Sequence, residues 1–492
     1  MYTVNLHTHL RHVGFGEPGT DRSPCLAYAV LGVLVLLAAG LRFYHLGEWS
    51  YFVDELHTAV DAPVRAKQAI SNLLALDYHH AFWLLTQFAF DLFGTSAFSL
   101  RLFPCIIGIA TIPILYFIIK AISNYQIALL STFLLTISNW HVFMSQMARW
   151  YTLLLLTSFL SLISFYFFIE TKKIKYIFLF LVTFYFSLTL HLSAFFIAII
   201  AYVYILLLLL FPAFRPVNIS TRQLFFFVLL PLIFIPYLVQ KFYWFLSYWQ
   251  ETPWEHGVYG EDILIKLIYQ ITPSILLVTL SGALLLIHRK DRRGLFFSIY
   301  SFLPLLALSI ASTFKINVGT RYALVSLPAC LILASFFYFY IYKNLETHKR
   351  IIISILIFLL CSLTLQSNYF YYTTYYGNRG RLKEAIPYLK ANHLPTDSYM
   401  PYGLHAVKNH LTLSQTAKLE GFDIPDANMI DPSLNAMPAH GRIWILTLNH
   451  IRPNSTGLRR WMSDQTHLMA EYPAQLGPQD YTLKIYLYTP PD

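Results

Sequence analysis

A series of long apolar runs constrains this chain more than any other feature. The runs recur between Cys25 and Gln366, and each is about as long as the 20 residues that a helix needs to cross a hydrocarbon core about 30 Å thick. Of the 492 residues, 57% are hydrophobic and only 12% are charged. This composition excludes a soluble enzyme, a disordered tail and a nucleic-acid-binding protein. The sequence therefore predicts a mainly α-helical, polytopic membrane protein.

The apolar runs predict about eleven transmembrane helices. They lie at residues 24–42, 98–119, 126–143, 150–169, 174–190, 193–211, 223–240, 263–287, 295–312, 321–342 and 351–367. A further run, 81–93, is short and contains Gln87 and Asp91. We interpret this run as an interfacial helix, because it is too short to span the bilayer.

The charge pattern predicts the orientation of these helices. The net charge of +10 comes largely from basic clusters between the apolar runs, such as Lys172-Lys173-Lys175 and 288–293. Basic clusters between spans mark the cytoplasmic side, so they do not indicate nucleic acid as a partner. Eleven spans place all of these clusters and a tail, residues 1–23, inside. The sequence thus predicts a multi-pass plasma (inner) membrane protein surrounded by membrane lipids.

The same topology divides the chain into a transmembrane domain, 24–367, and an external domain, 368–492. The transmembrane domain then has a first external loop at 43–100. In the external part, the segments RIWILTL and YTLKIYLY have the pattern of strands, and RLKEAIPYLKAN that of an amphipathic helix. We expect a small external α/β domain there.

Two adjacent carboxylates, Asp54 and Glu55, lie a few residues after the first span. Acidic groups this close to lipid need a reason, and a functional site is one. The other is structural, since Asp and Glu are common in the first turn of a helix, where they face the positive end of its dipole.

Several segments in the order of the chain resemble the protein O-mannosyltransferase and aminoarabinose transferase group, which are membrane glycosyltransferases of the GT-C fold. These segments are Asp54-Glu55, the stretch from Asp77 to Phe82, the stretches 93–102 and 145–151, Leu190-His191 and Arg321-Tyr322. The chain departs from the family pattern in two places. Both prolines are missing from the 77–82 segment, and Met147 stands where the family has glutamate.

The resemblance implies an inverting glycosyltransferase that moves a hexosyl or pentosyl group from a polyprenyl-phosphate carrier to an acceptor on the external or periplasmic face. It implies Asp54 as catalytic base, with Glu55 as an orienting group or second acid. The implied substrate-binding residues are Asp77, His79, Gln146, Arg149, His191, Arg321 and Tyr322. Ordinary structural roles remain open for them: arginines that reach for lipid headgroups, a core histidine, and polar residues at a helix rim.

No cofactor is certain from the sequence. A divalent metal ion is possible, because Asp54, Glu55, His79 and His80 carry the carboxylate and imidazole groups that such ions accept. The acceptor is open among a lipid, a protein and a polysaccharide. Two other functions also stay open: a lipid or polysaccharide transporter or flippase, and a non-catalytic scaffold with a GT-C-like fold.

Overall fold

The computed structural model describes most of the transmembrane part and about two thirds of the part that follows it. The described residues are 24–71, 79–229, 243, 261–314, 318–374, 376–402, 417–418, 422–425, 428, 430, 441–449, 456–476, 479–480 and 482–490. The predicted tail, 1–23, and the loop residue Asp77 lie outside this set.

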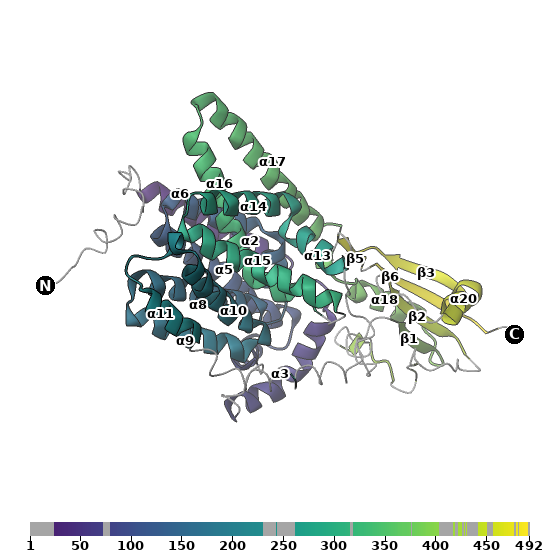
Figure 1. Ribbon diagram of the computed structural model, residues 1–492. Helices are drawn as coiled ribbons and strands as arrows, with labels where there is room; N and C mark the ends of the chain where they lie inside the picture. Colours follow the sequence, from purple (N-terminus) through teal and green to yellow (C-terminus); the bar gives the residue numbers. More distant parts are fainter. Residues whose placement is uncertain are drawn as a thin grey trace.

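The first part of the chain is a bundle of helices (Figure 1). Its first half consists of α2 (Pro24–Phe43), α3 (Val53–Ser71), α4 (His80–Phe93), α5 (Ala97–Ile122), α6 (Tyr125–Ile137), α7 (Asn139–Ser145), α8 (Tyr151–Thr171) and α9 (Ile174–Leu190). Its second half consists of η1 (Leu192–Ala194), α10 (Phe195–Leu210), η2 (Pro212–Phe214), α11 (Thr221–Leu229), α13 (Glu261–Ile271), α14 (Pro273–His288), α15 (Arg292–Thr313), η4 (Thr320–Ser326), α16 (Leu327–Asn344) and α17 (Thr347–Tyr372).

The helices agree with a multi-pass membrane protein, but the number of spans differs from the prediction of eleven. Within the described ranges, seven helical stretches are long and apolar enough to cross a membrane, and up to nine if each of two bent helix pairs counts as one span. The short apolar helix α9 occupies the predicted run 174–190, and most of the run 223–240 falls outside the described residues. The count of eleven is therefore not confirmed.

Two runs that the sequence shows as continuous are broken in the structure. The helices α6 and α7 meet at 60° across Ser138, and α13 and α14 meet at 84° across Thr272. Thr272 has a positive φ of 79° and precedes Pro273, which begins α14 and cannot continue a helix from the residues before it.

A buried arginine stabilises the break between α6 and α7. The guanidinium group of Arg42, at the end of α2, donates hydrogen bonds of 3.3 Å each to the carbonyl oxygens of Leu135 and Thr136. Carbonyls at the end of a helix lack partners within it, so this arginine satisfies groups that the break exposes. The break directs α7 so that the following turn, 146–150, lies beside the start of α3.

The bundle buries its central helices and leaves others at its periphery. The stretches Tyr151–Thr171 and Thr320–Asn344 are the most enclosed, with 72% and 78% of their apolar windows buried, whereas that of α17 is only 20% buried. In Figure 1, the end of α16 and the start of α17 form a hairpin that projects from the body. We interpret the exposed apolar face of α17 as a lipid-facing surface.

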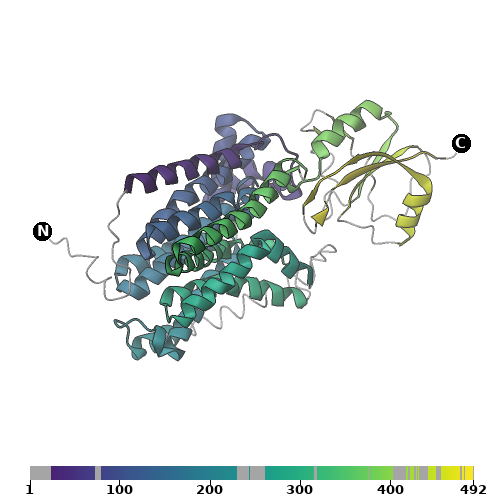
Figure 2. The ribbon, with the colours of Figure 1, turned by 90° about the horizontal axis from the view of Figure 1, so that it is seen from above.

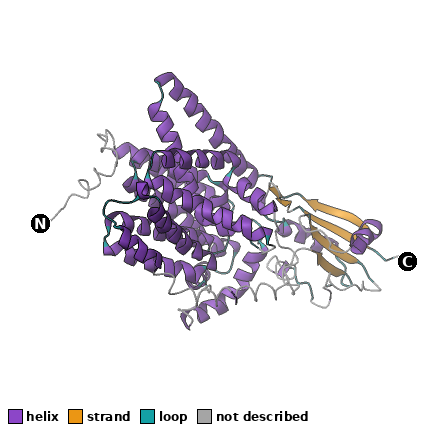
Figure 3. Ribbon diagram, in the orientation of Figure 1, coloured by secondary structure: helices purple, strands orange, loops and turns teal. Residues whose placement is uncertain are grey.

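A small mixed domain follows the last long helix. It contains η5 (Tyr376–Asn378), α18 (Leu382–Asn392), β1 (Ser398–Tyr402), β2 (Ile443–Leu448), α20 (Thr456–Gln465), β3 (Thr466–Tyr472), β4 (Gln475–Leu476), β5 (Gln479–Asp480) and β6 (Leu483–Tyr488). The four-stranded sheet has the order β1-β2-β6-β3, with β1 parallel to β2 and the other pairs antiparallel (Figure 3). The helix and two strands expected from RLKEAIPYLKAN, RIWILTL and YTLKIYLY are confirmed as α18, β2 and β6.

This sheet domain lies at one end of the helical bundle, as Figures 1 and 2 both show. A close contact fixes the junction. Gly377 has a φ of +62°, and a Cβ atom there would come within 2.3 Å of the Trp49 ring. Glycine is therefore the residue that fits, for both its backbone angle and its lack of a side chain. Tyr371 also packs edge-on against Trp49 at a ring distance of 5.1 Å.

Candidate active site

The start of α3 positions the two predicted acids and points them in different directions. Asp54 and Glu55 lie in the first turn, where carboxylates meet the positive end of the helix dipole. The Phe52 N–H donates a 2.9 Å hydrogen bond to Glu55 Oε2, which caps the helix. Adjacent helical residues point about 100° apart, so each acid reaches a different set of partners.

Asp54 lies between two arginines from distant parts of the chain. Its Oδ2 is 2.6 Å from Arg321 Nη1, and its Oδ1 is 3.1 Å from Arg149 Nη2. Arg149 belongs to the turn before α8, and Arg321 to η4 at the start of the α16 span. The side chains of Asp54, Arg149 and Arg321 are 20%, 14% and 32% exposed, so the cluster is accessible from outside the protein.

The two guanidinium groups control the charge of Asp54. Burial by itself raises the pKa of this carboxyl group, but the nearby charges of Arg321 and Arg149 outweigh that effect and bring the pKa to about 2. Asp54 is therefore an anion at neutral pH. A carboxylate with so low a pKa is a weak base while both arginines hold it.

Glu55 makes a fully buried network beneath this cluster. Arg101 binds it in a bidentate manner, with Nε to Oε1 at 2.9 Å and Nη2 to Oε2 at 2.7 Å. The Ala148 N–H donates to Oε1 at 2.8 Å, and Arg379 lies 3.4 Å away. Burial opposes ionisation of Glu55, but Arg101 and Arg379 hold its pKa well below the usual range. These contacts favour the predicted orienting role over that of a second acid.

An aromatic wall flanks the Asp54 cluster. The His79 ring stacks on Trp150 with centroids 3.3 Å apart, and the His191 ring stacks on Tyr322 at 4.8 Å. Arg149 lies over the face of Trp150, with its guanidinium carbon 4.6 Å from the ring centroid. The structure thus brings five of the predicted residues together, with His79 beside them. The five are Asp54, Arg149, His191, Arg321 and Tyr322.

Both histidines are held neutral. His79 Nδ1–H donates to the Leu190 carbonyl oxygen, and His191 Nδ1 accepts a 3.0 Å hydrogen bond from the Ser193 N–H. Burial lowers the pKa of His79 well below its usual value, and the proximity of His191 adds to this. Burial, together with Arg321 and Arg149, lowers the pKa of His191 to about 3. Neither ring therefore competes with the arginines for an anion.

Gln146, predicted to contact substrate, instead occupies a buried position under the turn. Its Nε2 donates to the carbonyl oxygens of Arg42 and Tyr44 at 3.0 and 2.8 Å, and its Oε1 accepts from the Tyr371 hydroxyl at 2.9 Å. These contacts use its amide group inside the protein, so the geometry favours a structural role. Its contact with substrate stays a prediction, as does that of Asp77, which lies outside the described residues.

The described residues do not fit the metal site that the sequence leaves possible. Within the described part of the chain, no group of three or more His, Cys, Asp or Glu side chains is arranged to hold an ion. Asp54 is paired with arginines, Glu55 is paired with Arg101, and His79 stacks on Trp150. We derive no metal-dependent step from this arrangement.

Sequence reasoning missed two arginines of the Glu55 network. Arg101 lies in the first turns of the apolar helix α5 and is fully buried, and a charged residue inside a predicted span is a signal that could have identified it. Arg379 carries no such signal, because it lies in a polar segment more than 300 residues from its partner.

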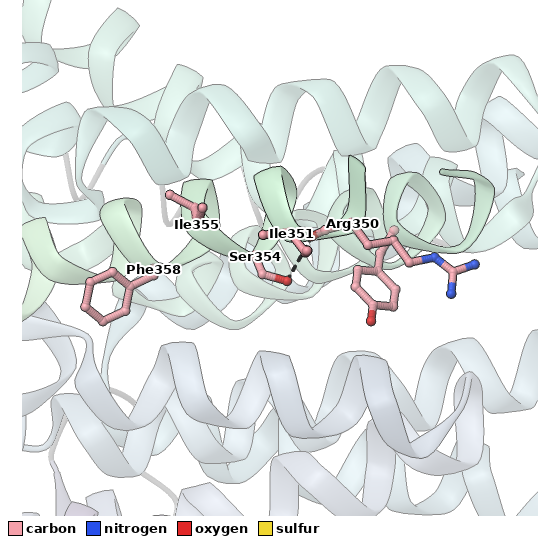
Figure 4. Close-up of a pocket in the computed structure, with 6 residues that line it drawn as sticks. Arg350, Ile351, Ser354, Ile355 and Phe358 are labelled. Carbon is pink, nitrogen blue, oxygen red and sulfur yellow. Dashed lines mark hydrogen bonds between the residues drawn. The ribbon is translucent and has the colours of Figure 1, made fainter. Parts of the chain in front are cut away.

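A separate cavity lies at the other end of α17. It has a volume of about 440 Å³ and is lined by Tyr342, Arg350, Ile351, Ser354, Ile355 and Phe358 (Figure 4). The opposite end of α17 contacts the site region, where the Tyr371 hydroxyl donates to Gln146. The lining residues of α17, 350–358, lie about 20 to 30 Å along the helix from Tyr371, so this cavity is no part of the Asp54 cluster.

The chain resembles known proteins in part of its sequence and in its fold. Residues 41–250 match the family described as dolichyl-phosphate-mannose-protein mannosyltransferase. No curated protein matches the sequence. The apo oligosaccharyltransferase of Archaeoglobus fulgidus has a similar fold, with a TM-score of 0.51 and 10% identity over 77% of this chain and 62% of that chain.

A second structure of the Archaeoglobus enzyme, tethered to an acceptor peptide, gives a TM-score of 0.51 and 10% identity over 87% of this chain and 70% of that chain. ArnT from Cupriavidus metallidurans in the apo state aligns over 94% of this chain and 98% of its own, with 12% identity and a TM-score of 0.48. Residues 41–250 thus resemble the dolichyl-phosphate-mannose-protein mannosyltransferase family, and the chain shares its GT-C fold with the oligosaccharyltransferase.

Proposed function

We propose that this protein is an inverting glycosyltransferase that moves a sugar from a polyprenyl-phosphate carrier to an acceptor at the external face of the membrane. One observation carries the proposal: Asp54 is held between the guanidinium groups of Arg149 and Arg321 in a partly exposed site. A carboxylate next to two such cations provides a base and a phosphate-binding group in the same place.

The charge balance of the site favours an anionic ligand. The carboxylates Asp54 and Glu55 are surrounded by four arginines: Arg149, Arg321, Arg101 and Arg379. Four positive and two negative charges leave an excess of +2. In addition, the buried Nε atoms of Arg149 and Arg321 have no hydrogen-bond partner in the described part of the chain. A lipid phosphate supplies both the missing acceptor atoms and the missing negative charge.

The proposed reaction is a single displacement. The acceptor hydroxyl loses its proton to the Asp54 carboxylate as its oxygen attacks the anomeric carbon. The bond from that carbon to the phosphate oxygen breaks, and the phosphate leaves with the electron pair, stabilised by Arg149 and Arg321. Because these arginines bind both Asp54 and the phosphate, a bound donor competes for them and raises the pKa of Asp54. The base therefore becomes stronger when the donor is in place.

The proposed donor follows from the family match, whose description names dolichyl-phosphate-mannose, a sugar on a polyprenyl phosphate. The external orientation is supported by the basic clusters. Tyr151 lies at the site end of α8, whereas Lys172 and Lys173 follow its other end. Arg292 and Arg293 likewise begin α15 at the end away from η4. Lysine and arginine concentrate on the cytoplasmic side, so the site faces outward.

Replacing Arg149 with lysine tests the phosphate-binding role. An ammonium group keeps the charge but loses the planar, multidentate hydrogen bonding of a guanidinium. We expect the KM for a radiolabelled polyprenyl-phosphate sugar to rise about tenfold, with a similar effect for Arg321→Lys. The measurement is transfer of label to candidate acceptors in membranes.

Arg222→Lys provides the matched control, because Arg222 is exposed in α11. It should leave the KM unchanged. Equal KM values for Arg149→Lys, Arg321→Lys and the wild type would exclude these arginines as the phosphate-binding groups.

A further inference from the structure

We propose that Arg379, at the entrance to the external domain, is a positioning residue for the transfer reaction, acting through Glu55 and the Gln146 carbonyl on the geometry of Asp54 and Arg149. The effect on turnover rests on the proposed function. The structural coupling does not, because it follows from contacts between the external domain and the site.

Arg379 is fully buried and joins three segments of the chain. Its Nη2 donates to the Gln146 carbonyl oxygen at 2.8 Å, and its Nη1 donates to the Gly377 carbonyl oxygen at 2.7 Å. Its Nε and Nη2 lie 3.4 and 3.5 Å from Glu55 Oε2 and Oε1. The guanidinium also lies over the Trp49 ring at 5.5 Å. One side chain thus contacts the first external loop, the 146–150 turn and the domain junction.

The Glu55 network links Arg379 to the proposed reacting groups, Asp54 and Arg149. Glu55 Oε1 accepts from the Ala148 N–H, while the Thr58 hydroxyl donates to the Ala148 carbonyl oxygen at 3.2 Å. The start of α3 therefore holds both polar backbone groups of Ala148. Asp54 precedes Glu55, and Arg149 follows Ala148. The 3.1 Å contact between Asp54 and Arg149 is consequently set by the same network that Arg379 completes.

The external domain is fixed to the same loop by a second contact. The Lys383 N–H at the start of α18 donates a 2.9 Å hydrogen bond to Ser50 Oγ. Together with the close packing of Gly377 on Trp49, this contact joins the start of the external domain to the first external loop at two points. A displacement of the external domain therefore acts on the first external loop, which carries Asp54.

Removal of Arg379 is compatible with a folded protein. Glu55 pairs with two arginines, and the bidentate pair with Arg101 remains when Arg379 is replaced by glutamine. The buried cluster then holds one negative and one positive charge, so no carboxylate is left without a partner. This balance makes Arg379→Gln a suitable variant.

The test compares Arg379→Gln with Arg381→Gln in the full chain, reconstituted in lipid nanodiscs. Arg381 lies two residues further along the same segment, pairs with Glu384 at the surface and serves as the matched control. Hydrogen exchange is measured on peptides covering 49–58 and 146–151, and transfer kinetics are measured with a polyprenyl-phosphate sugar. We expect Arg379→Gln to increase amide exchange at 146–151 about tenfold and to lower kcat about tenfold, because small displacements of reacting groups slow catalysis strongly.

A merely structural role predicts a different result. It lowers the melting temperature and the yield of folded protein but leaves exchange in both peptides and the kcat of the folded fraction unchanged, and this outcome would overturn the proposal. Arg379→Lys restores part of the kcat in a positioning role, because an ammonium group reaches Glu55 or the Gln146 carbonyl but not both in the same geometry. If Arg379→Gln fails to fold, Arg379→Lys alone decides by the same two measurements.

The experiment also separates this inference from the proposed function. If the wild type transfers no sugar from any carrier, the proposed function fails, while the exchange measurement still decides whether Arg379 couples the external domain to the Asp54 loop. If the wild type is active and Arg379→Gln changes neither exchange nor kcat, the coupling fails and the transferase function stands.

Discussion

Replacing Asp54 with asparagine is expected to reduce kcat for sugar transfer by about 10² to 10⁴-fold, the usual contribution of a general base. The variant should still fold and insert, because asparagine has the same shape and its side-chain oxygen continues to accept a hydrogen bond. Donor binding should be retained or become tighter, since the carboxylate no longer competes with phosphate for Arg149 and Arg321. Label transfer from a polyprenyl-phosphate sugar in membranes gives kcat, and binding of the labelled carrier to purified protein gives the affinity.

The matched control is Asp61→Asn, which removes one negative charge from the same helix two turns away from Asp54. This variant should transfer sugar at the rate of the wild type. The comparison also separates the transferase from the other functions that the sequence leaves open, because a transporter or a scaffold keeps its function when a base is removed. Turnover by Asp54→Asn within about twofold of the wild type contradicts a base at this position.

The sequence predicts the helices well where a span is continuous and poorly where tertiary contacts interrupt it. The runs at 98–119 and 150–169 correspond to α5 and α8, because length and apolarity alone determine such spans. The break at Ser138 could not be predicted in this way. It depends on hydrogen bonds from Arg42 to carbonyls about 90 residues away in the chain, and nothing in the apolar run itself marks them.

The sequence also predicts the residues of the candidate site only in part. The resemblance to family segments and the predicted topology both point to Asp54, Arg149 and Arg321, and the structure brings these three residues together. The orienting interpretation of Glu55 was available from its position, but its partners were not. Arg379 lies 324 residues away from Glu55 in sequence, and no local pattern connects it to the start of α3.

Replacing Glu55 with glutamine is expected to lower the free energy of unfolding by about 3 to 5 kcal/mol, because it removes the carboxylate that pairs with two fully buried arginines. The new amide NH₂ group also points a donor toward guanidinium donors and loses acceptor capacity for the Ala148 and Phe52 N–H groups. Thermal unfolding in detergent, followed with the yield of folded protein, measures the change.

Two further variants show whether the loss comes from the buried charges. Glu384→Gln removes a carboxylate whose side chain is 36% exposed and pairs with Arg381, so we expect a change of about 0 to 1 kcal/mol. The double variant Glu55→Gln, Arg379→Gln removes one of the two uncompensated arginines and should recover part of the lost stability, a positive coupling between the two sites. Equal destabilisation by Glu55→Gln and Glu384→Gln, or a double variant less stable than Glu55→Gln alone, would show that Glu55 does not act as the anion that holds these arginines together.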